Sequence, residues 1–170
     1  NVNFNNTDFT GADLSYSHFY VYYDNNGNRN YATFNGANLS DVDLTGASLS
    51  RIDFSNANMS GVNLTDANLS WANLSSTDLS NSIIHDTNFI MTDSIGIDLS
   101  GAQISGYGLG NLDLNGVNLS GANLINANLT NVDLTSTILD NVQAIGITYT
   151  DSQYSDRFAP KLPEDFVIVE

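Results

Sequence analysis

Three aspartates that could bind a cation, Asp93, Asp113 and Asp133, recur at intervals of twenty residues. Asp53 and Asn73 precede them at the same interval. In a fold that stacks such residues about 5 Å apart, like charges repel, so either the pKa values rise or cations bridge the carboxylates. Calcium prefers oxygen ligands of this kind. The alternative is that Asp only replaces Asn at a solvated position. Calcium is therefore the one cofactor that the sequence suggests, without a firm metal site.

Other chemistry is sparse. The chain has two histidines, His18 and His85, far apart in sequence, and no cysteine. No motif pairs a nucleophile with a base, and no glycine-rich phosphate loop follows a strand and opens a helix. The many serines belong to a repeat and have no base beside them. The sequence thus predicts no catalytic residue and a protein that is not an enzyme.

The charge is strongly one-sided. Nineteen acidic residues face four basic ones, for a net charge of −15. This argues against direct binding to nucleic acid, which needs clustered Lys and Arg, and against an anionic membrane surface. No apolar run approaches the ~18 residues that span a bilayer. The charge favours a cation, a basic protein surface, or imitation of a polyanion.

Large apolar residues recur at every fifth position. The blocks from residue 38 to residue 82 read NLSDV, DLTGA, SLSRI, DFSNA, NMSGV, NLTDA, NLSWA, NLSST and DLSNS. A second row of mostly Ala, Val and Thr stands two positions before each large residue. Of the thirty slots from position 4 to position 149, twenty-five hold Leu, Phe, Met or Ile, and the exceptions are Asp24, Arg29, Ser94, Ala144 and Tyr149.

Neither a helix nor a flat strand accounts for this period. A helix turns about 100° per residue and would scatter the large residues, and a strand would place successive ones on opposite faces. A coil that bends every five residues points all of them inward. Four repeats then form one square coil of twenty residues, and coils stack at about 4.8 Å through backbone hydrogen bonds. Residues 1–20 and 31–150 would give about seven coils.

These blocks resemble the pentapeptide-repeat family, whose motif reads A(D/N)LXX. The resemblance covers residues 1–150 and implies an all-β, right-handed quadrilateral β-helix with Leu or Phe in its core. A stacked solenoid of this kind lacks a deep pocket, which argues against catalysis. Some relatives are acidic DNA mimics that bind a type II topoisomerase, gyrase, and carry loops between coils. Those relatives dimerise through a C-terminal helix, and residues 150–170 show no amphipathic pattern of that kind.

The repeat breaks in three places. Asp24 and Arg29 fall in core slots, where an unpaired charge is costly, so residues 20–31 are expected to leave the wall as a hairpin or loop with Gly27 at its turn. This insertion either binds a partner or has no role. Tyr107 falls in a small-residue slot, which predicts a local bulge. The period ends after Thr150, and residues 151–170 form an irregular C-terminal tail.

The two ends of the coil predict self-association. The repeat is in register from Asn1, so one open edge lacks a cap, and the tail carries a short apolar run that is prone to form a strand. That run either covers its own solenoid or joins a neighbour, and the second case gives an open filament. The expected interaction residues are Asn1, Val2, Asn3, Phe4, Tyr22, Tyr23, Phe166, Val167, Ile168 and Val169.

Two functions therefore stay open. The first is a structural protein that assembles end to end. It would be extracellular or on the cell surface, because the chain is poor in Lys and begins at Asn1 instead of Met, which fits a mature product or an excised domain. The second is the topoisomerase-binding DNA mimic, which would place the protein in the cytoplasm.

Overall fold

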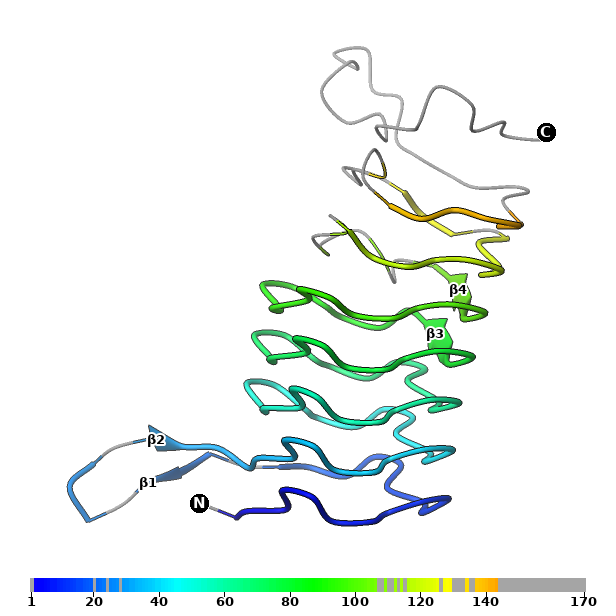
Figure 1. The fold of residues 1–170 in the computed structure, drawn as a ribbon. Coiled ribbons are helices and arrows are strands. Elements are labelled where there is room, and N and C mark those ends of the chain that lie inside the picture. The colour runs from blue at the N-terminus through cyan, green and yellow to red at the C-terminus, as the bar shows by residue number, and fades with distance from the viewer. Residues whose placement is uncertain are drawn as a thin grey trace, which may run out of the picture.

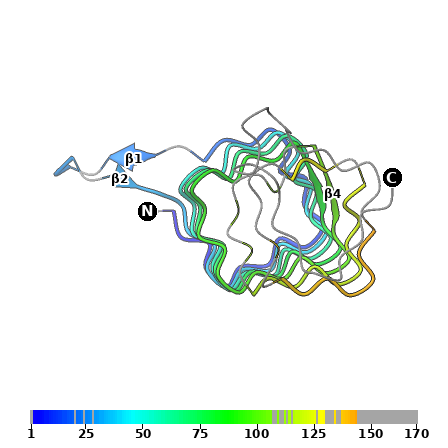
Figure 2. The same cartoon turned by 90° about the horizontal axis from the view of Figure 1, so that it is seen from above.

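The computed structural model describes residues 2–19, 21–23, 25–27, 29–106, 109, 112, 114, 116–125, 127–129, 134 and 137–143. Over these residues the chain winds into a stack of coils (Figure 1), and the view along the stack shows a four-sided outline (Figure 2). Four short strands are present: β1 (Tyr22–Tyr23), β2 (Arg29–Asn30), β3 (Ile83–His85) and β4 (Gln103–Ser105). The rest of the wall pairs through single parallel bridges between coils.

Each corner is a tight turn. In the turn at residues 39–42, the Val42 N–H donates to the Leu39 carbonyl at 3.3 Å, and Asp41 has a φ of 57°. A positive φ at the third residue with this hydrogen bond is the signature of a type II turn. The same conformation occurs at every fifth position from Gly36 to Gly106. The period of five in the sequence is thus a period of corners in the backbone.

The Asn or Asp before each large residue fixes the turn that follows. In one repeat the Asp43 Oδ1 atom accepts hydrogen bonds from the Thr45 N–H at 2.9 Å and from its hydroxyl at 2.6 Å. Asn63 and Thr65 repeat this arrangement at 3.1 and 2.7 Å. Such bonds from a side chain to the backbone two residues later favour turns. They explain why the repeat reads Asn or Asp, Leu, then Ser or Thr.

Bridges between coils confirm the predicted stack of seven levels. Asp8 pairs with Asn38, an offset of thirty residues, and all later steps on this face are offsets of twenty. The ten additional residues in the first step lie within the insertion at residues 20–31. On this face the bridges join, in order, Asp8, Asn38, Asn58, Asp78, Asp98, Asn118 and Ile138.

The core is the row of large side chains, as the period predicts. Every fifth residue from Phe34 to Leu134 is no more than 2% exposed. Ser94, which interrupts the apolar row, is also buried. Aromatic rings stack along the axis at the first coils, with centroids 4.8 Å apart for Phe4 and Phe34 and 5.2 Å apart for Phe34 and Phe54. The first coil packs against this core but is only partly buried.

The insertion leaves the wall as a hairpin. Strands β1 and β2 pair antiparallel, Tyr22 with Asn30 and Tyr23 with Arg29, and they project from the side of the stack (Figure 1). Arg29 is exposed, so the charge that the repeat would have placed in the core lies at the surface. Asp24 lies outside the described residues.

A second irregularity follows β4. The pairing offset is twenty residues at Gln103 and Asn123 but twenty-one at Gly106 and Ala127. An offset larger by one residue is what a bulge produces. Tyr107 itself lies outside the described residues, as do residues 144–170, so the predicted division into a solenoid over 1–150 and a tail over 151–170 stays a prediction. Among the described residues there is no apolar helix of membrane-spanning length.

Candidate functional site

One corner of the stack presents large side chains in a column. Residues 31, 51, 71 and 91 follow one another at the twenty-residue spacing of the coils. The guanidinium carbon of Arg51 lies 6.0 Å from the ring centroid of Tyr31 and 4.9 Å from that of Trp71. Both distances are in the range of cation–π attraction. Arg51 is therefore held between two aromatic rings on the surface.

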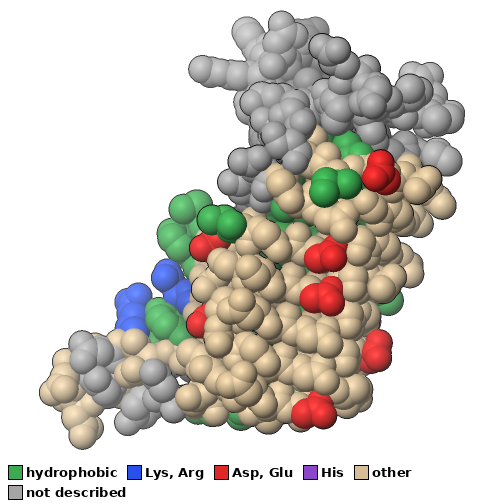
Figure 3. Space-filling view, in the orientation of Figure 1, with side chains coloured by type: hydrophobic (Ala, Val, Ile, Leu, Met, Phe, Trp, Pro, Cys, Tyr) green, Lys and Arg blue, Asp and Glu red, His purple; other side chains and the backbone are tan. Residues whose placement is uncertain are grey.

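The hairpin extends this column. Hydrogen bonds of the Arg29 side chain with Tyr23, and secondarily with Tyr31, raise the pKa of Arg29 above its ordinary value. A cavity of about 260 Å³ lies between hairpin and wall, and both Arg29 and Arg51 line it together with Asp53. Figure 3 shows the basic side chains of the described chain together, beside hydrophobic ones at the base of the hairpin. We call Arg29, Tyr31, Arg51, Trp71 and Met91 the arginine–aromatic corner.

The N-terminal coil presents an open edge. In the second coil the Asn38 and Asp43 N–H groups donate to the Thr7 and Ala12 carbonyls at 2.9 and 3.0 Å. The corresponding N–H groups of the first coil, on Asp8 and Asp13, have no backbone partner within the described chain. This edge is the place where a further strand or coil could pair.

Apolar side chains lie beside that edge. Val2 is 58% exposed, whereas Phe4 packs on Phe34. A second cavity, of about 170 Å³, has Val2, Phe4 and Phe19 among its lining residues. The first coil therefore combines unpaired backbone groups with an accessible apolar surface, which are the two features that strand addition uses.

Two carboxylates of the first coil hold local hydrogen bonds. The Thr10 hydroxyl donates to Asp8 Oδ1 at 2.6 Å and the Thr10 N–H donates to it at 3.0 Å; these bonds lower the pKa of Asp8. The Ser15 hydroxyl and N–H do the same for Asp13, whose pKa is also lowered. Hydrogen bonds to the charged form of a carboxyl group stabilise that form.

The aspartate column exists, but its described part contains no cation site. Asp53, Asn73 and Asp93 stack on one face. The Asn73 amide donates to Asp53 Oδ1 at 3.1 Å, and Ser55 donates to the same oxygen, so structural partners already occupy it. Within the described residues no three acidic or histidine side chains could hold a metal ion. Asp113 and Asp133 lie outside them, so calcium binding there stays a prediction.

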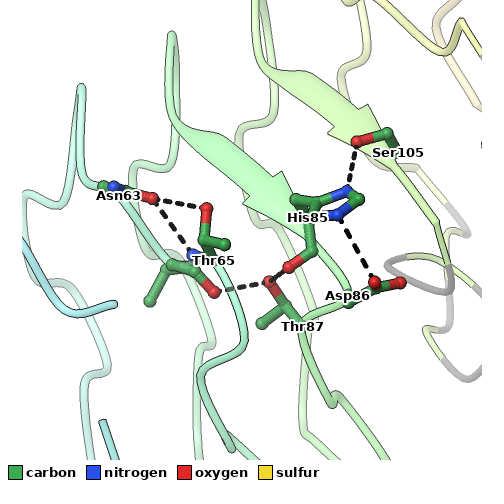
Figure 4. A network of polar contacts seen from close by, with 7 residues as sticks. Asn63, Thr65, His85, Asp86, Thr87 and Ser105 are labelled. Carbon is green, nitrogen blue, oxygen red and sulfur yellow. Dashed lines mark hydrogen bonds and ion pairs between the residues drawn. The ribbon is translucent and has the colours of Figure 1, made fainter. Parts of the chain in front are cut away.

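The structure brings together one polar cluster that sequence reasoning missed. His85 Nδ1 lies 2.8 Å from the Ser105 hydroxyl, one coil further along, and His85 Nε2 lies 3.4 Å from Asp86 Oδ2 (Figure 4). The His85 and Asp86 side chains are 49% and 41% exposed. The two ring nitrogens contact a serine and an aspartate, but the cluster lies on an open surface, where water competes for each group. Only the twenty-residue offset could have revealed it.

The structure describes only some of the predicted interaction residues. Val2, Asn3 and Phe4 do lie together on the first coil, where Asn3 pairs with Thr33. Tyr23 is 55% exposed on the hairpin. Asn1, the Tyr22 side chain and Phe166, Val167, Ile168 and Val169 lie outside what the structure describes. Arg51, Trp71 and Met91 were absent from the prediction, although their common spacing of twenty residues could have identified them.

The architecture defines a class: a right-handed quadrilateral solenoid of five-residue repeats. Comparison with known families gives the same result. The model for pentapeptide repeats matches residues 1–20, 30–61, 63–106 and 109–146 in eight copies. These residues are more than half of the chain, and the chain belongs to the pentapeptide-repeat family.

Solved structures of the family resemble it. Two trypsin-treated variants of QnrB1, a plasmid-mediated fluoroquinolone resistance protein, are 25% and 23% identical to this chain, with TM-scores of 0.51 and 0.50. Each alignment covers 91% of this chain, and 82% and 83% of QnrB1. Rfr23 from the cyanobacterium Cyanothece 51142 is 20% identical to this chain, with a TM-score of 0.38. That alignment covers 84% of this chain and 83% of the Rfr23 chain. No curated protein matches the sequence.

Proposed function

We propose that this protein is a non-enzymatic scaffold that acts through protein contacts, and that its first coil joins a second copy end to end. One observation carries the proposal. The Asp8 and Asp13 N–H groups lack the backbone partner that their counterparts in the next coil have within the described chain. A neighbouring chain that offers carbonyl groups in the same register would extend the parallel ladder of the wall.

The contact would be heterologous, because the first coil of one copy has to meet a different surface of the next copy. Such contacts continue into an open filament unless the rotation closes a ring. The Val2 side chain and the cavity beside it supply apolar area to the same contact. The C-terminal residues 166–169, an apolar and strand-prone run, are the donor that we propose.

The test separates the edge N–H from the side chain that accompanies it. Asp13→Pro removes the N–H, whereas Asp13→Ala removes the same carboxylate and keeps the N–H. Sedimentation velocity over a range of concentrations, followed by electron microscopy, is expected to show assembly for the native chain and for Asp13→Ala. Asp13→Pro is expected to stay monomeric with an unchanged circular dichroism spectrum. Monomers of the native chain at every concentration, or equal assembly of the two variants, would overturn the proposal.

An extracellular or cell-surface location belongs to the same proposal, with the cytoplasm as the alternative. A filament-forming protein with no cysteine and few lysines suits an exposed structural role. Fractionation of the source cells with an antibody against the purified chain distinguishes the two locations. Recovery of the protein only with the cytoplasm would remove this part of the proposal and leave the assembly test unaffected.

Binding to a type II topoisomerase is the second candidate. The net charge of −15 and the hairpin that projects between the first two coils favour it. A protein of this charge could occupy a basic DNA-binding surface on the enzyme. A gyrase supercoiling assay tests this idea, since competition for DNA is expected to inhibit supercoiling in proportion to the added protein. Unchanged supercoiling at a large molar excess would exclude it.

A further inference from the structure

The arginine–aromatic corner is built at a cost to the backbone. Arg51, Trp71 and Met91 have φ values of 66°, 64° and 58°. A left-handed conformation is unfavourable for a residue with a side chain, and less so for Gly, Asn or Asp. The corresponding positions at the other three corners, where φ is positive, hold Gly, Asn or Asp, except for Tyr16 and Ser76. Residues kept in strained conformations cluster at functional sites.

The corner also concentrates positive charge in an acidic protein. The chain has four basic residues, and two of them, Arg29 and Arg51, line one cavity. Neither arginine has a carboxylate within ion-pair distance among the described residues. The Arg51 guanidinium contacts aromatic rings, which leaves its hydrogen-bond donors available to a ligand. Arg29 uses part of its five donors on Tyr23 and Tyr31 and keeps the others for a ligand.

Apolar area continues from the charged part. Trp71 is 49% exposed and Met91 is 61% exposed. Ile90, which precedes Met91 in the same turn, is 45% exposed, and Ile95, in the next turn of the same coil, is 71% exposed. A row of exposed large apolar side chains next to two arginines is typical of a protein-binding surface, in which Arg, Trp and Met are enriched.

We propose that the arginine–aromatic corner binds an acidic segment of a partner protein that carries two carboxylates and a large apolar side chain. The carboxylates pair with Arg29 and Arg51, because guanidinium and carboxylate groups match in geometry and charge. The apolar side chain packs on Trp71 and Met91. This surface adjoins the cavity beside Val2, because Tyr31 lines both cavities. It includes none of the unpaired N–H groups of the first coil, so the inference does not depend on end-to-end assembly.

A nucleic acid is the competing ligand, since arginines interleaved with aromatic residues also bind single strands. Two observations favour the acidic protein segment. Asp53 lines the same cavity, which halves the local positive charge from two to one. The net charge of −15 repels a polyphosphate chain over a distance of about 10 Å at moderate salt. A short peptide with two carboxylates meets much less of that repulsion.

Trp71 makes the test direct, because it is the single tryptophan of the chain and its emission reports on this corner. The probes are a synthetic Glu-Phe-Glu peptide with blocked ends, the matching Lys-Phe-Lys peptide, and an oligothymidylate. The Glu-Phe-Glu peptide is expected to change the Trp71 emission in a saturable manner. Arg29→Gln, which leaves the Arg51–Trp71 contact in place, is expected to weaken this binding about tenfold.

The matched control is Ile83→Gln, an exposed residue on a different face, which is expected to bind the peptide as the native chain does. Arg51→Lys keeps the charge but not the planar fork, so its affinity is expected to fall between those of the native chain and Arg51→Gln. Calorimetric titration repeats each measurement without the fluorophore. Equal binding of the two peptides, equal affinity of Arg29→Gln and the native chain, or tighter binding of the oligothymidylate would each overturn the proposal.

Discussion

The guanidinium carbon of Arg51 lies 4.9 Å from the ring centroid of Trp71, the residue one coil further along the same corner. The contact joins two coils through their side chains, in addition to the backbone hydrogen bond from the Arg51 N–H to the Ser70 carbonyl at 3.0 Å. An exposed cation–π pair contributes about 0.5–1 kcal/mol. Part of the stability of this corner therefore comes from outside the core.

Arg51→Gln is expected to lower the free energy of unfolding by about 0.5–1 kcal/mol, because the cation is lost while the chain length is nearly kept. Urea unfolding followed by circular dichroism measures the change. Arg51→Lys serves as the control, since it keeps a cation over the ring and is expected to lose less. A stability of Arg51→Gln equal to that of the native chain would mean that the contact contributes nothing.

Two hydroxyl groups of the small-residue row differ in their partners. The Thr77 hydroxyl donates to the Phe54 carbonyl at 2.9 Å, and the Ser82 hydroxyl is buried without a hydrogen-bond partner within the described chain. Ser82→Ala is therefore expected to stabilise the protein by about 1 kcal/mol, since an unsatisfied buried group is removed. Thr77→Val keeps the side-chain shape but loses the bond, and is expected to cost about 1 kcal/mol.

Chemical denaturation of both variants against the native chain checks this pair. The two substitutions lie in the same row and one repeat apart, so differences in burial contribute little to the comparison. Opposite signs are the expected result. A loss of stability in Ser82→Ala would indicate that its hydroxyl has a partner, such as a bound water, and would contradict the prediction.

The sequence predicted the fold well because one physical constraint repeats in every block. A large apolar residue at each fifth position has to point inward, and from Phe34 to Leu134 each such position is buried. The charge at Arg29 correctly indicated a departure from the wall, because a core slot could not hold it. Regular burial therefore determined both the coil and the place where the coil is interrupted.

The candidate site was predicted only in part, for a physical reason. The period of five constrains only the buried positions. It therefore gives no information on which side chains at the exposed, variable positions contact one another. Arg51 and Trp71 belong to separate blocks, and only the stack of coils brings their side chains into contact. The same holds for His85 and Ser105, which lie twenty residues apart. The open edge was predictable because it depends on the backbone and not on the identity of side chains.

The hydrogen bonds of Asp8 and Asp13 imply a dependence on pH. Their pKa values in the folded protein lie below the 3.8 of an unperturbed aspartate, chiefly through the Thr10 and Ser15 hydroxyl groups. A carboxyl group whose pKa is lower in the folded than in the unfolded protein stabilises the fold at every pH above its unfolded-state pKa. This stabilisation is lost as the pH falls through the pKa of the folded state. The first coil is thus expected to loosen only in strong acid.

Nuclear magnetic resonance titration of the side-chain carboxyl carbons measures both pKa values. Thr10→Val removes the hydroxyl donor and is expected to return the pKa of Asp8 toward 3.8, while that of Asp13, whose donor is Ser15, stays where it is. Movement of both values together would contradict the assignment to local hydrogen bonds. A folded pKa of Asp8 above 3.8 in the native chain would contradict the shift itself.

At Met91 a single substitution is expected to change stability and peptide binding in opposite directions. Its side chain is 61% exposed and its backbone is left-handed, with a φ of 58°. Asn adopts this conformation at lower cost, so Met91→Asn is expected to stabilise the protein by about 1 kcal/mol, seen as a higher unfolding temperature. Met91→Leu, which keeps a large apolar side chain and the strain, is expected to unfold at the same temperature as the native chain.

If the corner binds as proposed, Met91→Asn gains stability and loses affinity for the Glu-Phe-Glu peptide, because strain and binding belong to the same side chain. An Asn variant less stable than the native chain would show that Met91 is held by contacts within the fold.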